Sequence, residues 1–130
     1  MIKVSFSFRY WHSCGIVTTP TGKKEYVVAG GNDDWITLDQ QGSVEILDLE
    51  TFEWRDAPDF PTPFYSAHSV PFGDTFLVVG GSSNNDYLKS IYEYDVNSGE
   101  FFMRSEILSR PRPGAAASAV SSNYLGCTLN

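Results

Sequence analysis

Cysteine and histidine are scarce in this sequence, and their positions argue against a disulfide framework and against a metal centre. The 130 residues include only Cys14, Cys127, His12 and His68 of these two types. The cysteines lie far apart and lack the close spacing of zinc ligands. We therefore expect no metal and no other cofactor. The missing disulfide framework favours a reducing, cytoplasmic location, with the compartment left open.

Basic residues and long apolar runs are also few, which excludes two classes of partner. Lys and Arg number 9 against 16 Asp and Glu, so the formal net charge is −7. Nucleic acids and anionic membrane surfaces both need a basic face. No apolar run approaches the ~20 residues of a membrane span, and the alternating residues 4–8 are too short for the core of a signal peptide. We expect neither nucleic acid nor membrane as a partner.

The common catalytic motifs are absent as well. The sequence has no Gly-x-Ser-x-Gly elbow and no phosphate-binding glycine loop. The pair Asp33-Asp34 lacks the spaced acidic ladder of a calcium loop, and Cys14 has no evident base. His12 and His68 leave a two-histidine metal site as the alternative. The sequence therefore predicts no catalytic residues and a protein that is not an enzyme.

The sequence contains two copies of one pattern. An apolar run ends in the pair Gly30-Gly31, and the same arrangement recurs fifty residues later at Gly80-Gly81. Two further positions recur at a constant offset of 47: Leu47 and Trp54 in the first copy, Tyr94 and Phe101 in the second. The three-residue difference falls in the loop after the glycine pair, where length changes are tolerated.

This pattern resembles the kelch repeat, which is marked by a glycine pair, a tyrosine, six residues and a tryptophan. Leu47 stands in place of the tyrosine in the first copy, and Phe101 in place of the tryptophan in the second. The resemblance covers roughly residues 9 to 120. It implies a β-propeller in which each repeat forms one four-stranded blade, and it implies that the protein binds partner proteins.

The apolar segments around the glycine pairs and the repeated aromatic positions predict strands without reference to any family. Each copy has four short apolar segments separated by turn residues, at residues 13–17, 25–29, 43–48 and 53–55, and at residues 67–70, 75–79, 90–95 and 101–103. No window shows a sustained helical period. We predict an all-β fold, namely an incomplete kelch-type β-propeller segment of about two and a half four-stranded antiparallel blades.

The predicted propeller segment spans residues 1–130 as one partial domain. Repeat 1 takes about residues 9–55, repeat 2 about 64–103, and a truncated repeat 3 about 111–130. Matching residue types aligns His12 with His68 at an offset of 56, and residues 61–70 with residues 111–120 at an offset of 50. The shared position of the histidines indicates a scaffold role.

The glycine pairs and the large rings have expected structural roles. Glycine lets a strand end turn sharply and lets neighbouring backbone approach. We expect the rings of Trp54 and Phe101, which recur at one position of each repeat, to pack between blades.

The longer loops predict a binding face. In a four-stranded meander, the loops between strands two and three share one face with the loops between repeats. Loops on a rigid scaffold commonly carry function, and exposed aromatic and arginine residues commonly dominate interfaces. The predicted partner-binding residues are Asp34, Trp35, Asp86, Tyr87, Arg104, Arg110 and Arg112. A solvated loop surface without a partner is the alternative.

These observations predict a protein-interaction module, such as a scaffold or adaptor fragment, whose partner the sequence does not name. Two alternatives remain open: a fragment of an oxidase-like or sialidase-like propeller enzyme whose catalytic residues lie outside this chain, and an inert gene fragment. Both ends of the chain fall inside a repeat, so we expect open apolar faces on the first and last blades. Such faces predict self-association or pairing with another kelch-like chain.

Overall fold

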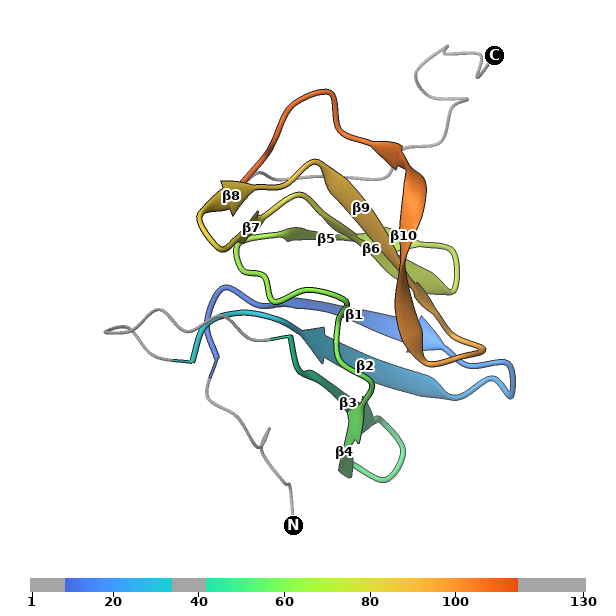
Figure 1. The fold of residues 1–130 in the computed structure, drawn as a ribbon. Coiled ribbons are helices and arrows are strands. Elements are labelled where there is room, and N and C mark those ends of the chain that lie inside the picture. The colour runs from blue at the N-terminus through green and yellow to red at the C-terminus, as the bar shows by residue number, and fades with distance from the viewer. Residues whose placement is uncertain (1–8, 34–41, 115–130) are drawn as a thin grey trace, which may run out of the picture.

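A computed structural model describes residues 9–33 and 42–114 of the protein, and this part of the chain is all-β (Figure 1). It contains strands and turns and no helix, which confirms the all-β prediction. In the same residues there is no helix of the length and apolarity needed to cross a membrane.

The first sheet is an antiparallel meander of four strands in the order β1-β2-β3-β4. Its strands are β1 (Ser13–Thr18), β2 (Lys24–Ala29), β3 (Val44–Asp48) and β4 (Trp54–Ala57). The predicted segments of the first copy coincide with these strands to within two residues at each end, because short apolar segments bounded by turn residues favour strands.

The second sheet repeats this topology in the order β5-β6-β9-β10. Its strands are β5 (His68–Phe72), β6 (Thr75–Val79), β9 (Ser90–Asp95) and β10 (Glu100–Ile107). A small hairpin that we did not predict, β7 (Ser82–Ser83) with β8 (Asp86–Tyr87), fills the connection between β6 and β9. Within the described residues the structure thus holds two separate four-stranded antiparallel sheets.

The two sheets share one register at the outer pair of strands. Leu47 lies opposite Trp54 in the first sheet, and Tyr94 lies opposite Phe101 in the second. Both turns before the outer strand begin with an aspartate. Asp48 Oδ1 accepts hydrogen bonds from the N–H of Glu50 at 2.8 Å and of Thr51 at 3.1 Å, and Asp95 Oδ1 accepts one from the N–H of Asn97 at 2.9 Å. These backbone donors lower the pKa of both carboxyl groups.

The core lies between the two sheets and is rich in aromatic rings. Phe60 contacts Phe64, Tyr92 and Phe101, with ring centroids 4.3, 4.5 and 4.8 Å away. Phe76 and Tyr94 stack at 6.2 Å. These rings pack against buried aliphatic side chains of the first sheet: Val17, Val27, Ala29, Val44 and Ile46. Burial of this area supplies the main force that holds the sheets together.

Strand β1 of the first sheet runs close to β5 and β6 of the second. A Cβ atom on Gly15 would lie 2.4 Å from the ring of Phe76, so only glycine permits this approach. The N–H of Cys14 donates to the Ser69 hydroxyl at 3.0 Å. Figure 1 shows the second sheet stacked against the first, with the β1–β2 and β5–β6 turns on the right and the β7–β8 hairpin on the left.

Candidate functional site

The glycine pairs hold each sheet to the chain that follows it. Gly31 and Gly81 have φ of 97° and 93°. The N–H of Gly31 donates to the Phe64 carbonyl at 2.7 Å, and the N–H of Gly81 donates to the Arg112 carbonyl at 3.1 Å. A Cβ on Gly31 would lie 2.8 Å from the Tyr10 carbonyl oxygen. Positive φ and this close backbone approach both require glycine here.

A second set of backbone hydrogen bonds links three residues, one from each successive copy of the repeated pattern. Trp11, Ser66 and Gly114 have φ of 57°, 55° and 62°. The N–H of Ser66 donates to the Trp11 carbonyl at 2.9 Å, and the N–H of Gly114 donates to the Ser66 carbonyl at 2.8 Å. The carbonyl at this left-handed position therefore accepts a hydrogen bond from the N–H of its counterpart in the next copy of the pattern.

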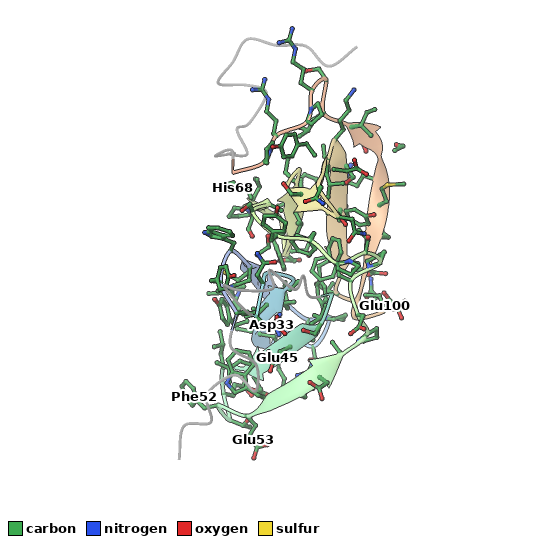
Figure 2. All side chains as sticks on the ribbon, turned by 60° about the vertical axis from the view of Figure 1, so that its left-hand side comes forward. Asp33, Glu45, Phe52, Glu53, His68 and Glu100 are labelled. Atoms are coloured by element: carbon green, nitrogen blue, oxygen red, sulfur yellow. The ribbon has the colours of Figure 1, made fainter. Side chains whose placement is uncertain are left out.

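These three residues border a surface hollow of about 290 Å³. Its lining consists of the three linked residues and their neighbours: Trp11, His12, Ser66, Ala67, His68 and Gly114. The indole of Trp11 is half exposed and stacks on Tyr65 at 6.0 Å. The hollow lies where β1 and β5 begin, and Figure 2 labels its lining residue His68.

The electrostatics of the hollow favour a neutral imidazole at His12. Partial burial lowers the pKa of His12, and the positive charge of Arg9 lowers it further. The Arg9 guanidinium itself is buried. It donates to the carbonyl oxygens of Gly30 at 3.1 Å and Ser43 at 3.0 Å, and it forms an ion pair with Glu45 at 2.5 Å. The hollow thus offers imidazole and hydroxyl hydrogen-bonding groups beside an aromatic surface.

The predicted equivalence of His12 and His68 is wrong by one residue. The bridge between Tyr10 and Asn32 corresponds to the bridge between Tyr65 and Ser82, which sets the offset at 55 and not 56. His68 therefore corresponds to Ser13. Matching residue types misled the alignment, because the backbone register is set by the glycine pairs and not by the histidines. The structure nevertheless brings both histidines to one hollow.

The third copy is also shifted relative to our alignment. The hydrogen bonds make Gly114 the counterpart of Ser66 and Arg112 the counterpart of Phe64, an offset of 48 and not 50. The proline-rich similarity between the second and third copies lies in the connection before the strand, where length varies freely. The rest of the third copy, residues 115–130, lies outside the described residues.

The predicted partner-binding residues divide into three groups. Asp34 and Trp35 lie outside the described residues. Exposed positions on the longer connections include four of the others: Asp86, Tyr87, Arg110 and Arg112. Tyr87 is 65% exposed on β8. The backbone of Arg112 is fixed, since its N–H donates to Leu88 O at 3.2 Å and its carbonyl accepts from Gly81.

Arg104 lies within β10 and not in the loop after it, which corrects the predicted loop boundary. Its guanidinium forms ion pairs with Glu93 and Glu106 and lies 5.2 Å from the ring centroid of Phe72. These contacts separate Arg104 from the other predicted partner-binding residues that the structure describes, which lie on the longer connections.

Sequence reasoning missed one buried polar group beside the site. The side chain of Asn32 is fully buried, and neither its amide nitrogen nor its oxygen has a hydrogen-bond partner within residues 9–33 and 42–114. Its counterpart in the second sheet, Ser82, is also buried. The available signal was a polar residue directly after each glycine pair. Sequence reasoning likewise missed Trp11 and Ser66, because a left-handed non-glycine residue has no sequence mark.

Within the described ranges, no three or more His, Cys, Asp or Glu side chains cluster closely enough to bind a metal ion together. In comparisons with known proteins, no protein-family model matches the chain. No curated protein matches it either. The kelch resemblance therefore rests on the repeated sequence pattern.

Proposed function

We propose that this chain is a segment of a kelch-like β-propeller that binds a protein partner through the face carrying the longer connections. The observation that carries the proposal is the set of hydrogen bonds that link Trp11, Ser66 and Gly114. Blades arranged around a common axis would present the same backbone position of each unit toward that axis. Equal strand registers in the two sheets support the same arrangement.

The exposed side chains of the longer connections support a protein partner. Tyr87, Arg110 and Arg112 are exposed on connections whose backbones are hydrogen-bonded or paired nearby. Aromatic and arginine side chains on rigid supports lose little entropy on binding and dominate interface energies. A hollow of about 290 Å³ lies at the lower limit of small-molecule pockets. Its size suits one inserted side chain of a partner better than a large cofactor.

The groups around the hollow favour binding over catalysis. A serine nucleophile needs an imidazole within hydrogen-bonding reach and a third group that orients the imidazole. In the part of the chain that the structure describes, the Ser66 hydroxyl has no hydrogen bond to His12 or His68, and no carboxylate lines the hollow. The enzyme-fragment alternative therefore depends on residues other than these.

The test is chemical cross-linking in native lysate, followed by quantitative mass spectrometry, with matched variants of the chain. Tyr87→Ala and Arg112→Ala should each weaken binding to the recovered partner by about 30-fold, the equivalent of roughly 2 kcal/mol for a true hot spot. Phe52→Ala is the control, because Phe52 is a 51% exposed ring in the β3–β4 turn.

If binding survives Tyr87→Ala and Arg112→Ala but falls with Phe52→Ala, the partner binds the face with the short turns. That result would overturn the proposal. Each variant must keep the wild-type circular dichroism spectrum, so that a lost partner reports a lost contact and not a lost fold.

A further inference from the structure

The outer edge of the second sheet is a separate surface with its own pattern. The strand order puts β10 at the opposite edge from β5, whose first residue, His68, lines the hollow. Among the described residues β10 pairs only with β9. It has eight residues, and its large apolar side chains are exposed: Phe102 by 46%, Met103 by 61% and Ile107 by 65%.

The corresponding edge of the first sheet is built differently. Strand β4 has four residues, and none of them is an exposed large apolar side chain. Arg55 on β4 is held by Glu25 in an ion pair of 2.9 Å. Short, charged edges resist pairing with further strands, whereas a long edge with exposed apolar side chains is a template for another strand. Strand β10 is therefore the edge that is open to pairing.

Charged and aromatic residues alternate along β10 from Glu100 to Arg104; its register with β9 is regular as far as Met103 and shifts between Met103 and Ile107. Phe102 lies opposite Glu93 on β9, and Arg104 forms an ion pair with Glu93, so Phe102 and Arg104 share one face of the sheet. Glu100 lies two residues before Phe102 and points to the same face. Figure 2 labels Glu100 at the margin of the structure. Glu100, Phe102 and Arg104 thus form an acid-ring-base series centred on Phe102.

We infer that β10 pairs antiparallel with β10 of a second copy of this chain, with a two-fold axis at Phe102. In this register Glu100 of each copy lies opposite Arg104 of the other, and the two Phe102 rings meet at the axis. On the other face Met103 lies opposite Phe101 and becomes covered. Opposite-charge and aromatic cross-strand pairs both stabilise antiparallel strands, and a two-fold axis makes one surface complementary to itself.

The net charge of −7 acts against this dimer, because two like-charged copies repel each other. Added salt screens that long-range repulsion more than it weakens the closely apposed pairs. Dimerisation should therefore strengthen from low to physiological ionic strength, about 0.15 M. The inference does not depend on the proposed partner-binding face, since β10 and the hollow lie at opposite edges of one sheet.

The test is analytical ultracentrifugation of the whole chain over a concentration series, with charge reversals. Glu100→Arg places like charges opposite each other in the dimer, and Arg104→Glu does the same with the sign reversed. Each variant alone should dimerise at least about tenfold more weakly than the wild type. An equimolar mixture of the two variants places opposite charges at both pairs and should recover the dimer as a heterodimer.

A second pair of variants keeps the test independent of the ion pairs of Arg104. Phe102→Ser should abolish dimerisation, while Phe52→Ser, which removes a similarly exposed ring from the β3–β4 turn, should leave it unchanged. Wild-type chain that stays monomeric at every concentration overturns the inference. The inference is also overturned if the mixture of Glu100→Arg and Arg104→Glu forms no more dimer than either variant alone. Equal effects of Phe102→Ser and Phe52→Ser on dimerisation overturn it as well.

Discussion

The N–H of Ser66 donates a hydrogen bond to the carbonyl of Trp11 at 2.9 Å, and both residues have left-handed backbone conformations. Non-glycine residues rarely adopt this conformation, which costs about 1–2 kcal/mol per residue. Here the hydrogen bond between the two residues offsets this cost. Gly114, the counterpart of Ser66 in the third copy, has a φ of 62°. The conformation is thus a property of the position in the repeat and not of its residue type.

Replacing Gly31 with alanine should destabilise the fold strongly. The added Cβ would lie 2.8 Å from the Tyr10 carbonyl oxygen at a φ of 97°, so both strain and a clash with backbone oppose it. We expect a loss of at least about 2 kcal/mol in the free energy of unfolding, measured by urea denaturation.

Gly22→Ala is the matched control for this change. Gly22 has φ of 87° but no atom within 4 Å of the added Cβ, so only the conformational cost of about 1 kcal/mol applies. Equal losses for the two variants would show that the close approach at Gly31 contributes nothing.

Glu45→Ala should cost about 3–5 kcal/mol, because it leaves the Arg9 guanidinium buried without its carboxylate. Both side chains of this ion pair are only 3% exposed. Glu50→Ala is the control, since the Glu50 carboxylate is 62% exposed and lies 3.6 Å from Lys23. An exposed pair of this kind contributes little to stability, because water screens it. Thermal melts of Glu45→Ala and Glu50→Ala at the same pH measure the loss of stability in each variant. Similar losses of stability in the two variants would contradict the prediction.

Stability should fall at alkaline pH through Tyr26. Burial raises the pKa of Tyr26 to about 12, and the neighbouring Cys14 adds to the shift. The unfolded tyrosine releases its proton near its ordinary pKa of about 10. Between these two values the folded state binds more protons than the unfolded state, so stability is fully present below pH 10 and declines as the pH rises toward 12.

The measurement for Tyr26 is the melting temperature from pH 9 to 12 in wild type and in Tyr26→Phe. The variant should show a shallower decline above pH 10, whatever its stability at neutral pH. Tyr87→Phe, at an exposed position on β8, should decline in parallel with the wild type. If the melting temperature of Tyr26→Phe also declines in parallel with that of the wild type, Tyr26 is not the cause of the alkaline loss of stability.

Asn32→Leu should be neutral or stabilising by up to about 1 kcal/mol. A buried amide without a hydrogen-bond partner costs about 1–3 kcal/mol, and an apolar side chain of similar size avoids that cost. Chemical denaturation measures the difference. A loss greater than 1 kcal/mol would mean that the amide is hydrogen-bonded in solution, for example to an ordered water molecule.

Local pattern was sufficient to predict the strands but not the alignment between repeats. The apolar segments, the glycine pairs and the constant offset of 47 are short-range features, and the pairs Leu47–Trp54 and Tyr94–Phe101 lie opposite one another as that offset implies. The alignment of His12 with His68 relied on residue identity alone and was wrong by one residue. The β7–β8 hairpin was missed because two-residue strands leave no periodic signal.

The sequence by itself determined the all-β class, the order and approximate limits of eight strands, and the positions where glycine is needed. These follow from short apolar segments bounded by turn residues and from backbone sterics, which act over a few residues. Only the tertiary structure decided that Trp11, Ser66 and Gly114 join at one hollow, and that Arg104 belongs to an edge strand. Contacts between residues about fifty positions apart depend on how the sheets pack, and no local pattern encodes that packing.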